Sequence, residues 1–260
     1  MRLLPPAIAA LLLATASAFA AAPLPRLLFF ANPMTSDNDV VRRPKPDELS
    51  VAERRFSELS RGVFEVTITQ DGSEVTGPKL ARYDAIVFFT AIEPPGADVE
   101  ALIAWVKKGG AFIGLHSTAN TYKRIPAFGE MLGAVFDQRP WRTAAAPQTK
   151  VRILVNDATH PSTRHLPAAF EFEDDIYQFK NFDAANVRLL LSLDPDRLDL
   201  NAKKANRTTR AFPVAWAREY GAGRVFYTAL GDWDQTWTDP RFRTHLVQGI
   251  FWAMKREAKP

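Results

Sequence analysis

The chain has 260 residues, 47% of them hydrophobic and 24% charged, which is the composition of a globular protein and excludes collagen-like, coiled-coil and wholly disordered chains. Its 33 basic and 29 acidic residues leave a net charge of +4, spread along the whole sequence. Because nucleic-acid binding proteins usually concentrate basic residues in a stripe, we expect no nucleic-acid partner. Cysteine is absent, which excludes disulfides, thiolate metal ligands and cysteine nucleophiles.

The first residues have the features of an export signal. Arg2 supplies a positive charge, residues 3–13 are mostly apolar, and residues 18–20 fit an A-x-A cleavage pattern. The apolar run is too short to span a bilayer, which takes about 20 residues. We therefore predict a signal peptide at residues 1–22, one mature domain at residues 23–260, export to the bacterial periplasm, and no stable membrane anchor after cleavage.

Short apolar runs alternate with amphipathic segments in the first half of the mature chain. Strands are predicted at residues 26–31, 64–69, 85–89 and 111–115, and helices at residues 47–60 and 97–108. Further along, strands are predicted at residues 151–155, 187–193, 214–217 and 224–229, and a closing helix at residues 242–255. This alternation predicts an α/β protein with an open, mostly parallel sheet and helices on both faces.

Ligands of such sheets bind beyond the carboxyl ends of the strands, so position in the chain selects the candidate residues. His116, followed by Ser117, comes directly after the strand predicted at residues 111–115. An imidazole at this turn could be a general base, a general acid or a metal ligand, or it could be a hydrogen-bonded structural residue.

Asp232 follows another predicted strand, and Trp233, Asp234 and Trp237 lie next to it. Carboxylates beside indoles are frequent in sugar sites, where apolar sugar faces lie on aromatic rings. Burial in the core is the alternative for these tryptophans, above all for Trp237.

A third group lies in the segment FEFEDDIYQF, which contains Glu173, Asp174, Asp175 and Tyr177. On an extended strand, alternation would place Glu173 and Asp175 on one face and Asp174 on the other. Such a pair of carboxylates could carry out acid–base chemistry or hold a hard cation, and an exposed acidic turn is the alternative.

Five segments resemble the ThuA-like family of trehalose utilisation proteins: YDAIVFF, GGAFIGLHS, HPSTRHLPAAFEFEDDIY, FPVAWAREYGAGRVFYTALG and WTDPRFRTHLVQGIFWA. The resemblance implies a fold similar to that of class I glutamine amidotransferases, a flavodoxin-like three-layer sandwich. It also implies that His116 lies where those enzymes carry their nucleophilic cysteine, and Asp232 about where they carry the catalytic histidine. Because the chain has no cysteine, amidotransferase chemistry is excluded.

The chain departs from the family pattern at two positions. Relatives have L-G-H where this chain has Asp232 after Leu230-Gly231, and a histidine where Arg139 precedes Pro140. We therefore predict no metal. Instead we expect a His116–Asp232 dyad in which the carboxylate orients the imidazole and favours its protonated form.

The link to trehalose utilisation implies a carbohydrate substrate, and no cofactor follows from the sequence. We expect an exported enzyme acting on a glycoside or an oxidised (3-keto) sugar, with His116 as acid/base and Asp232 as its partner. Asp175 is the third catalytic candidate, and with Tyr177 it would bind hydroxyls or a cation. Sugar contacts are also predicted for Ser117, Trp141, His160, Trp233 and Trp237.

Four alternatives stay open at this point. Glycoside hydrolysis by paired carboxylates and elimination or isomerisation beside a carbonyl both fit the residues. The two rival classes are a non-catalytic sugar-binding protein on the same fold and a metal-dependent hydrolase that uses His116, Asp175 and Asp232.

Overall fold

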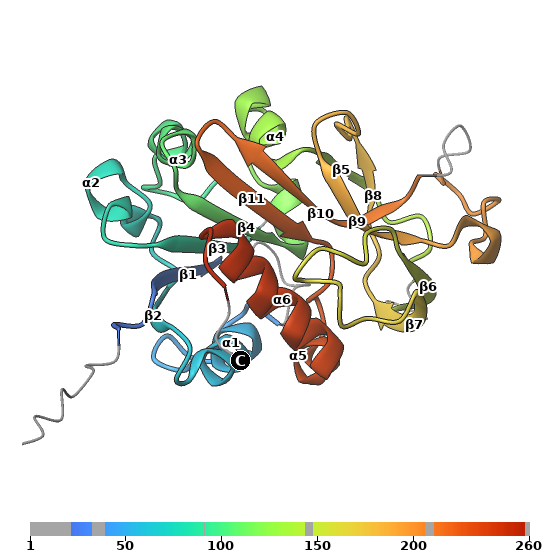
Figure 1. Ribbon diagram of the computed structural model, residues 1–260, viewed down its shortest axis with the longest axis horizontal. Coiled ribbons are helices and arrows are strands. Elements are labelled where there is room, and N and C mark those ends of the chain that lie inside the picture. The colour runs from blue at the N-terminus through green and yellow to red at the C-terminus, as the bar shows by residue number, and fades with distance from the viewer. Residues whose placement is uncertain (1–21, 33–39, 91, 144–147, 206–210, 258–260) are drawn as a thin grey trace, which may run out of the picture.

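A nine-stranded sheet in the order β2-β1-β3-β4-β11-β10-β9-β6-β7 forms the middle of the molecule (Figure 1). The computed structural model describes residues 22–32, 40–90, 92–143, 148–205 and 211–257. The strands of the large sheet are β1 (Arg26–Asn32), β2 (Glu65–Thr69), β3 (Ala85–Thr90), β4 (Ala111–Leu115), β6 (Thr149–Val155), β7 (Ala169–Asp174), β9 (Arg188–Leu193), β10 (Pro213–Tyr220) and β11 (Gly223–Thr228). Two further strands, β5 (Val135–Gln138) and β8 (Gln178–Lys180), pair in a small separate sheet.

Seven of the nine strands run in one direction, which confirms the mostly parallel sheet. Neighbours from β2 to β11 pair in parallel, and only β10 and β6 run against the others. The carboxyl ends of β4, β11 and β7 therefore point the same way. The reversal of β10 and β6 was not predicted, because an apolar pattern indicates which face a side chain occupies and not the direction of its strand.

Helices cover both faces of this sheet, as predicted for a three-layer α/β sandwich (Figure 1). The helices are α1 (Val51–Ser60), α2 (Gly77–Leu80), α3 (Val99–Lys107), α4 (Pro126–Leu132), α5 (Asp234–Thr238) and α6 (Pro240–Ala253). In Figure 1, α3 and α4 lie on one side of the sheet, and α1, α5 and α6 lie on the other. Every residue of β3 and β4 is buried between these layers, which explains their unbroken apolar sequences.

Side-chain caps fix where the first helices begin. The Ser50 hydroxyl accepts a hydrogen bond from the Glu53 amide at 3.2 Å, and the Glu53 carboxylate accepts one from the Ser50 amide at 2.8 Å. This capping box starts α1 at residue 51 rather than at the predicted residue 47. Asp98 likewise accepts from the Ala101 amide at 2.8 Å and starts α3 at residue 99 rather than residue 97.

The predicted signal peptide lies outside the described residues except for Ala22. Within the described part of the chain, none of the helices combines the length and the apolar character that crossing a bilayer requires.

Two of the four histidines are buried on either side of Ser162. His245, in α6, donates from Nδ1 to the Ser162 carbonyl oxygen at 2.9 Å, and His160 Nδ1 accepts from the Ser162 amide at 3.2 Å. Burial lowers the pKa of His160 to about 4 and that of His245 to about 3. Both imidazoles are therefore neutral at pH 7.

Replacement of His245 by Asn is expected to weaken the loss of stability in acid. In the unfolded chain the imidazole has a pKa of about 6.5, so between pH 6.5 and the folded-state value only the unfolded state takes up the proton. The contribution of the neutral His245 imidazole to the free energy of unfolding is fully present above pH 6.5. It falls by about 1.4 kcal/mol per pH unit as the pH drops below that value. The free energy of unfolding is measured with urea for both proteins from pH 7 to pH 4.5. As the pH falls, the wild type should lose more of this free energy than the variant does. A pH-independent difference would contradict a neutral His245.

Candidate functional site

His116 is the first residue after β4, and its backbone conformation is unusual. Its φ of +36° lies in the left-handed region that side chains other than glycine rarely adopt. The Tyr227 hydroxyl in β11 donates to the His116 carbonyl oxygen at 2.6 Å and so helps to hold this turn. The strand behind it packs closely, because a Cβ at Gly114 would lie 3.0 Å from the Tyr227 ring.

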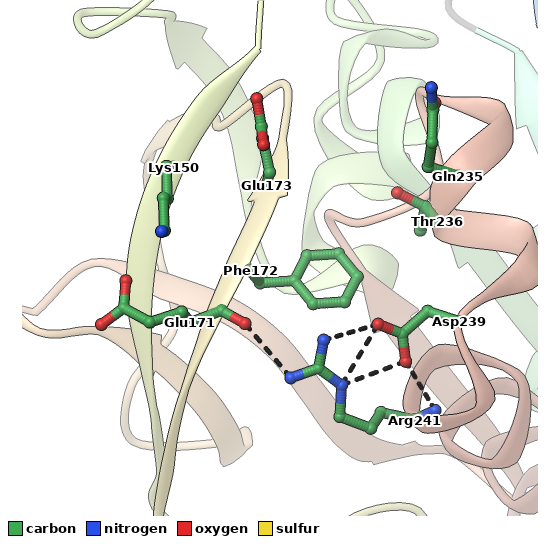
Figure 2. Close-up of a pocket in the computed structure, with 8 residues that line it drawn as sticks. All are labelled: Lys150, Glu171, Phe172, Glu173, Gln235, Thr236, Asp239 and Arg241. Atoms are coloured by element: carbon green, nitrogen blue, oxygen red, sulfur yellow. Dashed lines mark hydrogen bonds and ion pairs between the residues drawn. The ribbon is translucent and has the colours of Figure 1, made fainter.

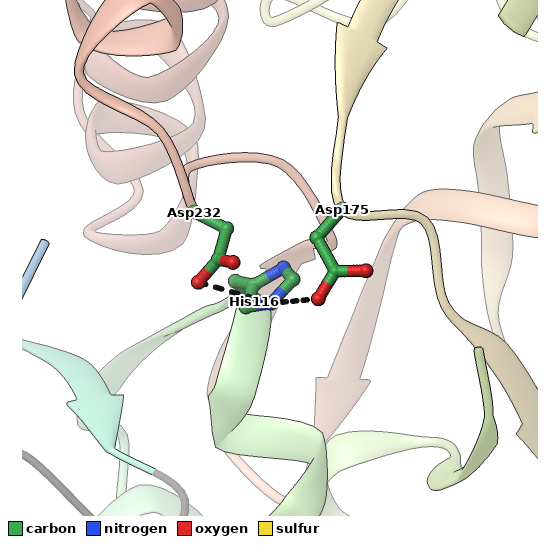
Figure 3. A group of neighbouring side chains, drawn as sticks. All are labelled: His116, Asp175 and Asp232. Carbon is green, nitrogen blue, oxygen red and sulfur yellow. Dashed lines mark ion pairs between the residues drawn. The ribbon is translucent and has the colours of Figure 1, made fainter. Parts of the chain in front are cut away.

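The hydrogen bonds of the His116 ring define its protonation. Nδ1 lies 2.7 Å from the Ala229 carbonyl oxygen, which can only accept, so Nδ1 carries a hydrogen and the neutral ring has a free lone pair on Nε2. Nε2 lies 3.4 Å from Asp232 Oδ1 and 3.9 Å from Asp175 Oδ2 (Figure 3). The structure thus brings the three predicted catalytic residues together, but Ala229 and not Asp232 orients the ring.

Burial controls the charges of these groups. The His116 side chain is 1% exposed, and burial lowers the pKa of its imidazole although Asp175 nearby raises it. Burial also raises the pKa of Asp232 to about 7 and that of Asp175 above its usual range. Carboxylate neighbours thus favour the protonated imidazole, as expected, but desolvation outweighs this attraction and the pKa of His116 is lowered overall.

Two arginines hold Asp175. Its Oδ2 lies 3.0 Å from Arg139 Nη1 and 3.1 Å from Arg142 Nη1. The Arg139 guanidinium also lies over the Tyr177 ring at 5.3 Å, and that ring is centred 4.1 Å from the His116 ring. Arg139 was noted in the sequence only as a replacement of a histidine, and Arg142 was missed because no strand or motif was predicted before it; the strand that precedes both is β5.

The predicted alternation of the acidic segment is wrong at Asp175. The strand β7 ends at Asp174, with Glu173 exposed and Asp174 buried. The chain then leaves the extended conformation, so Asp175 is buried as well instead of sharing the face of Glu173.

The donor atoms of His116, Asp175 and Asp232 lie within 4.8 Å of one another, a spacing that a divalent cation could bridge. However, both arginines meet the same Asp175 oxygen that faces His116. The two positive charges of these arginines repel a divalent ion at this position. A proton between His116 Nε2 and Asp232, in contrast, can be held without the charge of Asp175. The charge balance therefore favours a proton over a metal.

Two of the predicted sugar contacts lie beside this group in the chain. The Ser117 hydroxyl and the Trp233 indole N–H are buried and make no hydrogen bond to the described residues. Trp141 is half-buried, donates to the Asp199 carbonyl oxygen at 3.0 Å and packs on Phe212. The roles of these three side chains in binding stay predictions.

The other two predicted contacts, Trp237 and His160, are buried and have partners within the protein. Trp237 is 1% exposed, donates to the Gly231 carbonyl oxygen at 2.9 Å and stacks on Phe89 at 6.1 Å, so it is a core residue. His160 is fully buried against Ser162 and Trp252. These partners account for both side chains within the core, and the sugar contacts expected for Trp237 and His160 stay predictions.

A separate cleft of about 290 Å³ lies between the strands β6 and β7 and the helices α5 and α6 (Figure 2). Arg241 crosses it, bound to the Asp239 carboxylate and to the Glu171 carbonyl oxygen. Its lining residues do not include His116, Asp175 or Asp232, so this cleft is not the site of the predicted chemistry.

Comparisons with known proteins agree with this fold. The sequence matches the ThuA family, described as trehalose utilisation, over residues 40–253. A solved structure described as ThuA-like, from Bacteroides uniformis ATCC 8492, is 26% identical with a TM-score of 0.74, covering 94% of this chain and 97% of that one. A second ThuA-like structure, from Parabacteroides merdae ATCC 43184, is 16% identical with a TM-score of 0.66, covering 92% and 93%.

A structure from Thermoplasma acidophilum, described as a subunit of a GMP synthase, shares the fold at a TM-score of 0.51 with 10% identity, covering 90% of this chain and 96% of that one. No curated protein sequence matches the chain. The match over most of the sequence places the protein in a family with a sugar-related role and an amidotransferase-like α/β fold. The chain belongs to the ThuA (trehalose utilisation) family.

Proposed function

We propose that the protein is an exported enzyme of carbohydrate catabolism that acts on a glycoside or an oxidised (3-keto) sugar, with His116 and Asp232 as its proton-transfer pair. The observation that carries this proposal is the His116 Nε2 lone pair facing Asp232 Oδ1 at 3.4 Å, with the other ring nitrogen fixed by Ala229. Export rests on the sequence of residues 1–22.

The pair is suited to holding one mobile proton. Burial keeps the His116 ring neutral and raises the pKa of Asp232 to about 7, close to the value at which a general acid or base works best near neutral pH. The separation of 3.4 Å is longer than a hydrogen bond, as is common in free enzymes before the substrate tightens the site. The two groups titrate together, so the proton belongs to the pair.

The substrate meets this pair at Asp232. Its side chain is 10% exposed, against 1% for His116, so Asp232 lies on the outer side and His116 behind it. A proton leaving or reaching the substrate passes through the carboxylate, and Nε2 accepts it or supplies it.

The surroundings favour chemistry beside a carbonyl over hydrolysis by two carboxylates. Asp175 is fully buried and held by Arg139 and Arg142, so it is not free to attack a sugar carbon or to activate a water. The arginine side chains are 33% and 28% exposed and can stabilise an oxyanion formed next to the proton-transfer pair. A 3-keto sugar undergoing elimination or isomerisation is therefore the preferred substrate.

The proposal is tested by incubating the purified mature protein with trehalose, other glucosides and their 3-keto forms, and following products by NMR and mass spectrometry. Product formation is expected from the keto forms, with and without EDTA. Changing His116 to Ala should reduce turnover by about 10²–10⁴-fold, the usual contribution of a general acid–base group.

His245→Asn is the matched control, since it removes a buried histidine that lies outside the site, and its turnover should remain near that of the wild type. Sugar-dependent NMR shifts without any product would instead show a binding protein. Activity lost in EDTA and restored by a divalent ion would show a metal-dependent hydrolase.

The shared proton also has a consequence that needs no substrate. Asp232 has a folded-state pKa of about 7, so in the folded protein it keeps a proton that the unfolded chain releases near pH 4. Its contribution to stability is thus present below pH 4 and is lost by about 1.4 kcal/mol per unit as the pH rises to 7. Replacement of Asp232 by Asn removes this pH dependence. Between pH 5 and pH 7, the free energy of unfolding in urea should therefore rise for D232N relative to the wild type.

Asp234→Asn provides the control for this measurement. Asp234 lies two residues away, but its hydrogen bonds to Arg55 lower its pKa, so its variant should show no such gain in this range. Equal effects of D232N at pH 5 and pH 7 would contradict a protonated Asp232.

A further inference from the structure

We infer that Asp174 is the positioning residue of this site and that its carboxylate clamps together the two segments that carry Asp175 and Asp232. Its Oδ1 accepts hydrogen bonds from the Asp175 amide at 2.8 Å and from the Asp232 amide at 3.2 Å. Its Oδ2 accepts from the Gly231 amide and from the Thr236 hydroxyl, both at 2.8 Å. The catalytic consequence rests on the proposed function, whereas the clamp itself does not.

The hydrogen-bond pattern identifies Asp174 as an ionised acceptor. All four of its partners donate, and the side chain is fully buried, so no water competes for its oxygens. Burial raises the pKa of its carboxyl to about 7, and the hydrogen bonds from Gly231 and Thr236 oppose that rise. Loss of this carboxylate would leave three buried backbone N–H groups without an acceptor, and the chain around them would have to move.

The clamp binds the turn at residues 229–232, which carries the partners of both ring nitrogens of His116. Ala229 accepts from Nδ1, and Asp232, three residues later, faces Nε2. Between them Gly231 adopts a φ of +123°, a conformation that turns the chain back toward the imidazole. Because Asp174 binds the amides of Gly231 and Asp232, it fixes the distance between Nε2 and the Asp232 carboxylate.

Asp174 does not contact the substrate in this arrangement. It is 0% exposed, and its four acceptor positions are occupied by groups of the protein. Any effect on turnover must therefore pass through Asp175 and Asp232, which distinguishes a positioning residue from a catalytic one.

The test replaces Asp174 by Asn, which has the same size and shape. One carboxylate oxygen, an acceptor, becomes an NH₂ group that would face the donors of the clamp. Amide hydrogen exchange of the protein without substrate is measured by NMR, with the His116 ring nitrogens observed in the same samples. We expect exchange at Gly231 and Asp232 to accelerate at least tenfold and the His116 signals to shift. With substrate, kcat should fall by about 10²-fold, the cost of a small misplacement, while the dissociation constant for the sugar stays within threefold.

Two controls separate positioning from simple destabilisation. Leu246→Ala, in the buried face of α6, lowers the melting temperature without touching the clamp and should leave the His116 signals unchanged. Thr236→Val removes one donor of the four and should accelerate exchange at Gly231 less than the Asp174 variant does.

The outcomes are distinct. If D174N changes exchange and the His116 signals only as much as L246A does, the inference is wrong. If the amides of Gly231 and Asp232 exchange rapidly in the wild type, the clamp does not exist, and this result stands even if D174N does not fold. If the clamp effects appear but no sugar is turned over, the proposed function fails and the positioning role remains.

Discussion

The hydrogen bond from His116 Nδ1 to the Ala229 carbonyl oxygen, 2.7 Å long, governs the chemistry of the candidate site. Because a carbonyl cannot donate, this bond fixes the hydrogen on Nδ1 and presents the lone pair of Nε2 to the carboxylates. The bond itself depends on parallel strands: β4 delivers His116 and its neighbour β11 delivers Ala229 at the same edge of the sheet. A change in the register of these two strands would separate both nitrogens of the ring from their partners.

The buried charges around this ring come close to balance. Three carboxylates, those of Asp174, Asp175 and Asp232, face two guanidinium groups, those of Arg139 and Arg142, and both guanidinium groups bind Asp175. One negative charge is therefore left without a partner. A proton on the pair of His116 and Asp232 would complete the balance, in keeping with the raised pKa that burial gives the Asp232 carboxyl.

Much of the site could be predicted from the sequence because strand ends can be recognised from it. His116 and Asp232 each follow a short apolar run, so the rule for open parallel sheets selects them without any structure. The alternation placed Asp174 correctly on the face opposite Glu173, but it gave no sign that this carboxylate binds backbone amides of a distant segment. It failed at Asp175, because a period of two cannot show where a strand ends. Trp237 was assigned to the site because an indole beside a carboxylate has the same sequence pattern in a core and in a sugar site.

The reversed strands β10 and β6 have a consequence for how the candidate site forms during folding. They separate β11 from β7 in the sheet, yet β7 ends in the residue that binds the Asp232 amide 58 positions further along the chain. His116 and Ala229, in turn, are 113 positions apart. Contacts of such long range form late, after the loops between them have been closed. We therefore expect the candidate site to be among the last parts of the molecule to assemble. Partial opening of the antiparallel half of the sheet would disrupt the site before the parallel half unfolds.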